Sequence, residues 1–154
     1  MDHTHATPSA RQGISKPVLL VDDCADTLEM YQIGLTMAGF RPLVASGVAA
    51  LKQFEDERPV AVVADLGLGS LRDTWHVIEE IRNATATRQI PLVVLTGRLD
   101  SVIEANARRA SAALVLKPCL PDELARILHV VTTAVTTRAS GVGRQRVRRH
   151  ELAR

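Results

Sequence analysis

The sequence predicts an α/β domain built around a doubly wound, five-stranded parallel sheet. Short runs of aliphatic residues alternate along the chain with longer stretches of helical periodicity, and this alternation is typical of parallel sheets made from βα units. The runs are almost continuously apolar, as expected for strands covered by helices on both faces. With 46% hydrophobic but only 3% aromatic residues, the core must be aliphatic, which favours such a sheet over an aromatic-rich barrel.

Each element is predicted from its own stretch of sequence. Gly39 follows the first helix, Asp100 with Ser101 can cap the fourth, and Pro121 suits the first turn of the fifth. We expect strands at 17–21, 42–45, 60–64, 90–95 and 113–116. We expect helices at about 26–38, 47–57, 74–84, 100–110 and 121–137.

The 154 residues suit a single domain, which we place at residues 17–138. Residues 1–16 and 139–154 lack sustained apolar periodicity, so they are predicted to be a flexible N-terminal extension and a basic, flexible C-terminal tail. Six arginines and one glutamate lie between residues 138 and 154, whereas the whole chain has a net charge of +2. The predicted domain is therefore mildly acidic, and the basic character belongs to the tail.

Several classes of protein are not expected from this sequence. It has no apolar stretch near the ~20 residues that cross a bilayer, and its N-terminus has no apolar segment typical of a secretion signal. Two cysteines, Cys24 and Cys119, are too few for a disulfide framework and lack zinc-site spacing. We expect a cytoplasmic protein with reduced thiols.

Polar residues follow four of the five predicted strands. Ligands of open parallel sheets bind at the carboxyl ends of the strands, so these side chains are predicted to converge on one edge. They are Asp22 and Asp23 after the first strand, Asp65 after the third, Thr96 and Gly97 after the fourth, and Lys117 after the fifth.

Three neighbouring carboxylates repel one another unless a cation neutralises them. Mg²⁺ prefers oxygen ligands and retains several waters, so a shallow site with carboxylates and one backbone carbonyl suits it. Gly67, two residues beyond Asp65, is a candidate for that carbonyl. Lys117 beside these acids indicates an incoming anion, for which a phosphoryl group is the natural candidate.

Four fragments, VDDCAD, VADLGLG, VVLTG and VLKPC in that order, resemble the receiver domain of two-component response regulators over residues 17–138. Each fragment alone is weak, because an acid pair or a Lys-Pro pair after a strand occurs by chance. The four in order on five βα units make a specific match. The resemblance implies a flavodoxin-like (βα)5 receiver fold.

The resemblance also implies roles for individual residues. Asp65 would be the phosphoacceptor, and Asp22 and Asp23 would hold Mg²⁺ together with it. Thr96 and Lys117 would contact the phosphoryl oxygens. Gly97 would leave room for the group to enter.

The sequence departs from the family pattern at four positions. Leu114 stands three residues before Lys117, where an aromatic residue usually reports the movement of the threonine. The loop after Asp65 is one residue longer than the common form. It has Gly69 in place of a frequent proline, and Thr74 stands where glycine is usual. Ala110 replaces a helix-ending glycine.

These features predict a stand-alone response regulator that a sensor histidine kinase phosphorylates on Asp65. It would catalyse only its own phosphorylation and dephosphorylation, and signal through the surface of the fourth helix, fifth strand and fifth helix. A phosphorelay carrier serving a histidine phosphotransfer protein is an alternative, as is a phosphorylation-dependent homodimer. A third alternative is a nucleic-acid-binding regulator acting through the arginine tail, although the tail has no aromatic residue for base stacking.

Overall fold

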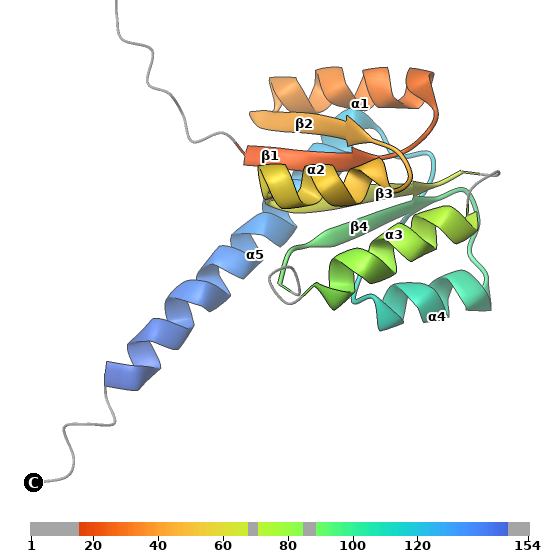
Figure 1. Cartoon of the computed structure of the whole chain (residues 1–154). Helices are drawn as coiled ribbons and strands as arrows, with labels where there is room; N and C mark the ends of the chain where they lie inside the picture. Colours follow the sequence, from red (N-terminus) through yellow and green to blue (C-terminus); the bar gives the residue numbers. More distant parts are fainter. Residues whose placement is uncertain (1–15, 68–70, 85–88, 148–154) are drawn as a thin grey trace, which may run out of the picture.

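A computed structural model describes residues 16–67, 71–84 and 89–147, with side chains omitted at Leu71 and from Arg138 onward. Strands and helices alternate along the whole described chain, as predicted (Figure 1). The strands are β1 (Lys16–Val21), β2 (Phe40–Ala45), β3 (Ala61–Leu66), β4 (Leu92–Thr96) and β5 (Ala113–Leu116). The helices are α1 (Ala25–Met37), α2 (Ala49–Glu57), α3 (Leu71–Asn83), α4 (Ser101–Arg109) and α5 (Pro121–Val147).

The five strands form one parallel sheet in the order β2-β1-β3-β4-β5. The doubly wound topology predicted from the sequence is therefore confirmed. From β1 the chain adds β2 on one side and then returns to add β3 on the other, so the order reverses between β1 and β3. In open α/β sheets the crevice outside the carboxyl ends at such a reversal is the usual place for a ligand.

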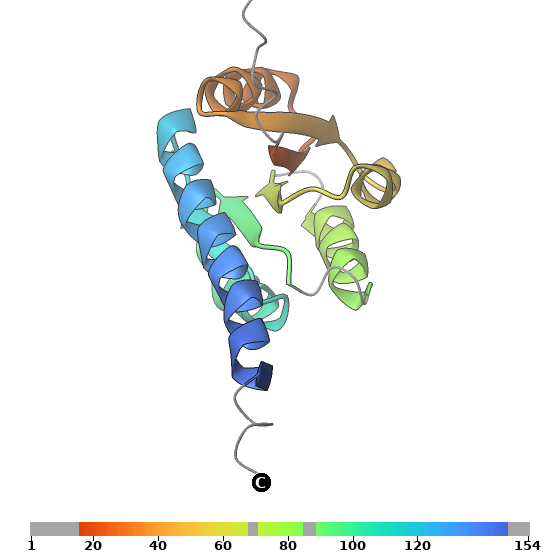
Figure 2. The same cartoon turned by 90° about the vertical axis from the view of Figure 1, so that its left-hand side faces the viewer.

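Successive residues of each strand face opposite sides of the sheet, and the two faces have separate cores. On one face Val18 and Leu20 pack with Leu35 of α1 and Leu128 of α5. On the other face Leu19 and Val21 pack with residues of α2, α3 and α4, among them Phe54, Ile78 and Ile103. Figure 2 shows α1 and α5 on one side of the sheet and α2 and α3 on the other. The covering on both faces explains the almost continuously apolar strands.

Predicted helix boundaries are confirmed where local chemistry marks them. Asp100 accepts hydrogen bonds from the N–H groups of Val102 (3.0 Å) and Ile103 (2.9 Å), which caps α4. Gly39, directly after α1, has φ +88°, a left-handed conformation that a side chain disfavours. Helix α5 begins at Pro121.

Other boundaries were predicted less well. Lys16, assigned to the flexible extension, is the first residue of β1, and α3 begins at Leu71 rather than near 74. Asp65 and Thr96, expected just after their strands, lie within β3 and β4. They pair in register with Leu95 and Leu66, respectively. Backbone hydrogen bonds to the neighbouring strand can extend a strand through polar residues. The pattern of apolar residues in the sequence does not reveal this pairing.

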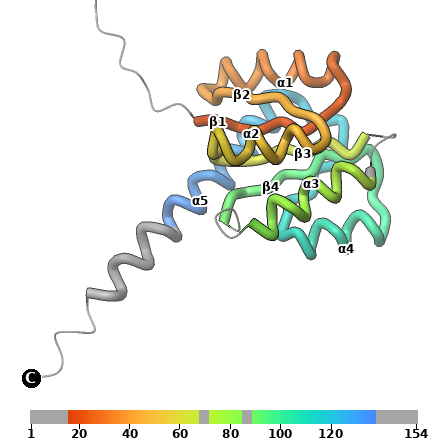
Figure 3. Tube along the Cα trace, viewed as in Figure 1, coloured from red at the N-terminus to blue at the C-terminus, as the bar shows by residue number. Residues whose placement is uncertain are grey.

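Helix α5 was expected to end near Thr137, but its backbone is helical to Val147. The prediction relied on apolar periodicity, which reports contact with a core, whereas an existing helix is propagated by its own hydrogen bonds. The helix starts at the edge where the strands end and runs back toward the other edge (Figure 1, Figure 3). The predicted loop residue Gly69, the extension at residues 1–15 and the arginines at 148–154 lie outside the described residues.

Among the described elements, no helix is both long and apolar enough to cross a membrane. Both cysteines are free thiols, with Cys24 exposed and Cys119 buried.

Candidate functional site

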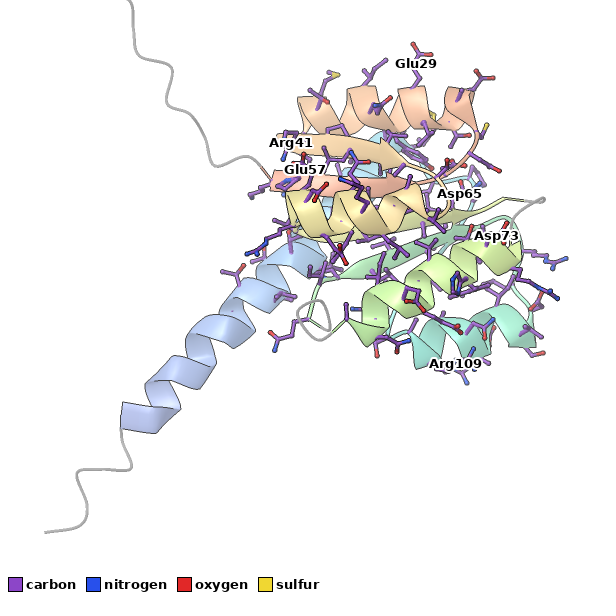
Figure 4. The ribbon with its side chains drawn as sticks, in the orientation of Figure 1. Glu29, Arg41, Glu57, Asp65, Asp73 and Arg109 are labelled. Atoms are coloured by element: carbon purple, nitrogen blue, oxygen red, sulfur yellow. The ribbon has the colours of Figure 1, made fainter. Side chains whose placement is uncertain are left out.

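The predicted site residues do converge on the carboxyl edge of the sheet. A cleft of about 710 Å³ opens there, and Asp65 lies at this edge in Figure 4. The register places Thr96 beside Leu66 of β3 and beside Leu116 of β5, so β3, β4 and the residue after β5 present their side chains together. The cleft is lined by Asp22, Asp23, Asp65, Gly67, Thr96, Gly97 and Lys117. The parallel topology therefore brings together every residue that the sequence assigned to the site.

Asp65 is a buried acid, with only 5% of its surface exposed. Its Oδ2 lies 2.5 Å from Nζ of Lys117. Neither carboxylate oxygen has a hydrogen bond of good geometry within the described part of the chain, so Oδ2 has the ion pair and Oδ1 has no polar partner. A buried oxygen without a partner is costly, and it marks a place where a ligand completes the site.

Burial raises the pKa of Asp65 above its ordinary value. Lys117 lowers it, whereas the carboxylates of Asp22 and Asp23 raise it further, and the net direction is upward. The site thus holds a carboxylate whose negative charge is incompletely compensated by the one lysine beside it.

Asp22 and Asp23 both follow β1, but their side chains differ in their contacts and exposure. Asp22 Oδ1 accepts hydrogen bonds from the backbone N–H groups of Asp23 (2.7 Å) and Cys24 (3.0 Å), and so forms the turn that leads into α1. The Asp23 side chain is exposed. Its Oδ1 lies 3.8 Å from the position that a Cβ on Gly67 would occupy, so this carboxylate lies near the Gly67 backbone.

The donors around the cleft fit Mg²⁺. They are carboxylate oxygens of three aspartates and the backbone of Gly67, and Asp65 Oδ1 has no other partner. Among the described residues, no group of three or more His, Cys, Asp or Glu side chains is already gathered as a metal cluster. Asp22 Oδ1 is hydrogen-bonded within its own turn, and Lys117 is the countercharge beside Asp65.

Thr96 ends β4 with its side chain almost fully buried. Its hydroxyl donates to the carbonyl of Arg98 at 2.8 Å, and Oγ1 is 3.3 Å from the Arg98 N–H, so the side chain holds the turn around Gly97. No atom lies within 4 Å of the position of a Cβ on Gly97. The space beside Gly97 is open, in keeping with the expectation that a group enters there.

Two positions that depart from the family pattern are Leu114 in β5 and Thr74 in α3, and Thr74 lines a hollow with Asp22 and Asp23. Leu114 is partly buried and packs on the core formed with α2, α3 and α4. Thr74 is buried in the first half of α3. An aliphatic side chain therefore fills the place of the usual aromatic, and no aromatic rotamer is available there to report a movement of Thr96.

Sequence reasoning missed two residues near the site. Arg98 lines the cleft from the loop after β4 and pairs with Asp100 at 3.3 Å. Its place two residues beyond Thr96, at a strand end, was a usable signal. Tyr31 of α1 donates a hydrogen bond to the carbonyl of Cys119, two residues beyond Lys117, at 2.8 Å. No local pattern connects these two positions.

Two transcriptional regulatory proteins are similar in sequence to this chain. The transcriptional regulatory protein PrrA of Mycobacterium tuberculosis is 30% identical over 132 residues, which are 83% of this chain and 55% of PrrA. PrrA of Mycobacterium leprae is 32% identical over 119 residues, 75% of this chain and 50% of PrrA. The chain thus spans about half the length of these relatives. No protein-family model matches the sequence.

Solved structures share the fold. A CheY-like response regulator receiver domain from Methanospirillum hungatei superposes with a TM-score of 0.72 and 19% identity, covering 80% of this chain and 98% of that one. Chemotaxis protein CheY4 of Vibrio cholerae gives 0.69 and 22%, covering 76% and 98%.

A third structure carries a metal. The receiver domain of the sensor histidine kinase PA1611 of Pseudomonas aeruginosa, which has a magnesium ion coordinated in its active-site cleft, gives a TM-score of 0.68 and 26% identity, covering 77% of this chain and 98% of that one. The sheet order, the acids and lysine at its carboxyl edge, and these relatives agree: the chain contains a receiver domain of the two-component response-regulator type.

Proposed function

We propose that this protein is a response regulator that accepts a phosphoryl group on Asp65 from a sensor histidine kinase. The observation that carries the proposal is the environment of Asp65. It is a buried carboxylate with one oxygen lacking a partner, it faces Lys117, and it lines an open cleft. Such a carboxylate is a nucleophile held ready beside a cation that can receive the charge of an incoming phosphoryl group.

In the proposed reaction an oxygen of Asp65 attacks the phosphorus of a phosphohistidine in line with the leaving imidazole nitrogen. The P–N bond breaks as the P–O bond forms, and the product is an acyl phosphate. Lys117 moves its ammonium from Asp65 to a phosphoryl oxygen, and the Thr96 hydroxyl turns from Arg98 to donate to another. No general base is needed, because the carboxylate attacks in its ionised form.

Asp22, Asp23, Asp65 and the Gly67 carbonyl are the groups we assign to Mg²⁺. When bound, the ion would neutralise charge on the carboxylates and on the transferred group. Water attack on the acyl phosphate returns Asp65 to its carboxylate and releases phosphate. The protein therefore catalyses only its own phosphorylation and dephosphorylation, and turns over no free substrate.

We further propose that the receiver domain itself makes a protein contact as part of its output. The surface formed by α4, β5 and α5 supports this proposal, because several of its apolar side chains are exposed to solvent. They are Val102 on α4, Leu116 at the end of β5, Leu120 in the following loop and Val130 on α5. Exposed apolar side chains that lie together are typical of a contact surface, and these four come from consecutive elements of the chain.

Labelling of the purified chain tests the proposal. Incubation with acetyl phosphate and Mg²⁺ should add one acid-stable, base-labile phosphoryl group to the wild type, and Asp65→Asn should abolish it. Asp56→Asn is the matched control, because Asp56 is an exposed acid of α2 paired with Lys52 away from the cleft. Labelling of Asp65→Asn at the wild-type level would refute the assignment.

A second measurement separates signalling from a relay. The phosphorylated protein is mixed with purified histidine phosphotransfer proteins. Retention of the label is expected for a signalling protein, whereas rapid transfer to a histidine would identify a phosphorelay carrier instead.

A further inference from the structure

Tyr31 is the single tyrosine of the chain, and its hydroxyl has one defined task. The side chain is 4% exposed and lies in the core between α1 and α5. Its hydroxyl donates to the Cys119 carbonyl at 2.8 Å, a contact between positions 88 residues apart. A buried tyrosine hydroxyl needs a hydrogen-bond partner, and here that partner is the carbonyl of a segment remote in sequence.

The loop that receives this hydrogen bond carries Lys117. It runs from the end of β5 at Leu116 to the start of α5 at Pro121. At its beginning, the Lys117 N–H donates to the Thr96 carbonyl at 2.8 Å. The Lys117 ammonium pairs with Asp65 Oδ2, so a displacement of this backbone moves the base of the side chain that makes this ion pair.

Helix α1 also fixes the far end of the loop. A Cβ on Gly34 would overlap the Cβ of Pro121, so the absence of a side chain at Gly34 lets α1 lie directly against the first turn of α5. Gly34 and Tyr31 are three residues apart and therefore share a face of the helix. One face of α1 thus contacts both the middle and the end of the loop.

We propose that Tyr31 is a positioning residue for Lys117: its hydroxyl holds the loop after β5 so that the ammonium stays at Asp65. The inference rests on the proposed phosphorylation of Asp65. Because α1 begins directly after Asp22 and Asp23, the same helix connects the acid pair with the lysine on the opposite side of the cleft.

Burial raises the pKa of Tyr31 to about 12, and the neighbouring Cys119, Asp65 and Asp22 raise it in the same direction. The phenol keeps its proton at neutral pH. It is therefore a constant donor to the loop.

The test is Tyr31→Phe in the full chain. Amide hydrogen exchange measured by NMR should be about tenfold faster at Lys117, with the amides of β1 unchanged, because the loop loses a tether. The rate of labelling by saturating acetyl phosphate at saturating Mg²⁺ should fall about fivefold. Leu35→Val is the matched control, since it weakens the same core from α1 while keeping the Tyr31 hydroxyl and its hydrogen bond to the loop. It should change neither quantity beyond twofold.

A double variant shows whether Tyr31 acts through the lysine. In a Lys117→Met background, which labels slowly, Tyr31→Phe should have no further effect on the rate. A multiplicative loss there would overturn the proposal, as would wild-type exchange at Lys117 in Tyr31→Phe. An equal loss of labelling in Leu35→Val would overturn it too. If the wild type takes no label, the phosphorylation proposal fails, and the exchange measurement alone still decides whether Tyr31 holds the loop.

If Tyr31→Phe does not fold, 3-fluorotyrosine incorporated at this single tyrosine supplies the second measurement. The fluorine resonance should shift when acetyl phosphate and Mg²⁺ are added, because Lys117 then moves from Asp65 and the loop adjusts. An unshifted resonance in protein shown to be phosphorylated would overturn the proposal.

Discussion

Asp65 shows at the scale of one residue how burial and charge oppose each other. Its carboxylate is buried at the end of β3, and in the described part of the chain its close countercharge is the Lys117 ammonium. The acids at positions 22 and 23 add repulsion, so the ionised form is less stable in the folded protein than in the unfolded chain. A bound ligand can relieve this repulsion, either as a cation beside the carboxylates or as an anion that pairs with the Lys117 ammonium.

We predict that Asp65→Asn stabilises the domain in a pH-dependent way. Because the folded-state pKa of Asp65 is raised, its stabilising contribution is present below the unfolded pKa and is lost as pH rises through the folded pKa. Asparagine has no such loss, so the variant should exceed the wild type by on the order of 1 kcal/mol at neutral pH, or about 3 to 6 °C in Tm.

The measurement is Tm of both proteins at pH 4 and pH 7.5 without Mg²⁺. The difference should be smaller at pH 4 than at pH 7.5, because the raised pKa of Asp65 favours its protonated form as pH falls. Added Mg²⁺ should narrow the gap at pH 7.5 by stabilising the wild type. A pH-independent difference would contradict the raised pKa.

Asp23 is the second residue with a separable prediction. Asp23→Ala should weaken Mg²⁺ binding, measured by calorimetry, by about tenfold or more, and phosphorylation should slow in parallel at limiting Mg²⁺. Glu29→Ala is the control, because Glu29 has the same charge on the outer side of α1, away from the cleft (Figure 4). Equal Mg²⁺ affinity in the two variants would exclude Asp23 as a ligand.

At the scale of elements, Arg82 joins α3 to the turn between α4 and β5. Its guanidinium donates to the carbonyls of Ala110 (2.5 Å), Ile90 (2.8 Å) and Ser111 (3.2 Å). Ser111 has φ +50°, a left-handed backbone conformation. The helix-ending glycine of the family stands one position earlier, where this chain has Ala110. The planar guanidinium of arginine has several N–H donors in fixed directions, which suits three converging carbonyls. The ammonium of lysine behaves as a point charge and does not match this arrangement.

We predict that Arg82→Lys destabilises the domain although the charge is kept. An ammonium cannot reach all three carbonyls, so the loss should be about 1–3 kcal/mol in the free energy of unfolding, measured with urea. Arg108→Lys, at an exposed arginine paired with Glu104 on α4, should cost about 0.5 kcal/mol or less. Equal losses would show that the carbonyl contacts of Arg82 do not support the fold.

At the scale of the whole molecule, the site and the far end of α5 lie at opposite edges of the sheet. The strands end at the cleft, whereas α5 starts there and runs back toward the other edge (Figure 1). Its fully buried leucines, Leu124 and Leu128, lie in its first turns. The later part of the helix is therefore not expected to support the site.

Truncation after Thr137 should leave Tm within about 2 °C, because the fully buried leucines of α5 lie before this point, and it should leave the acetyl phosphate labelling rate within twofold. It removes all six arginines between 138 and 154, so any binding to a DNA fragment should disappear, and in the full chain that binding should weaken steeply between two salt concentrations. A large loss of labelling would show that the last part of α5 supports the domain.

The sequence by itself determined the order of the elements and which polar residues meet at the carboxyl edge of the sheet. Aliphatic runs alternating with helical periodicity encode a parallel sheet, and such a sheet aligns its carboxyl ends, so Asp65, Thr96 and Lys117 had to meet. Local chemistry likewise placed the Asp100 cap and Gly39. These features depend on residues close together in the chain or on topology alone.

Only the tertiary structure decided which distant groups hold these residues in place. The Tyr31 contact with Cys119 and the Arg82 contact with Ala110 join positions 88 and 28 residues apart. No local pattern encodes such pairs, because they depend on how the helices pack across the sheet. The ends of β3 and β4 and the length of α5 were misjudged for a related reason: they depend on backbone hydrogen bonds, which polar and apolar residues make equally well.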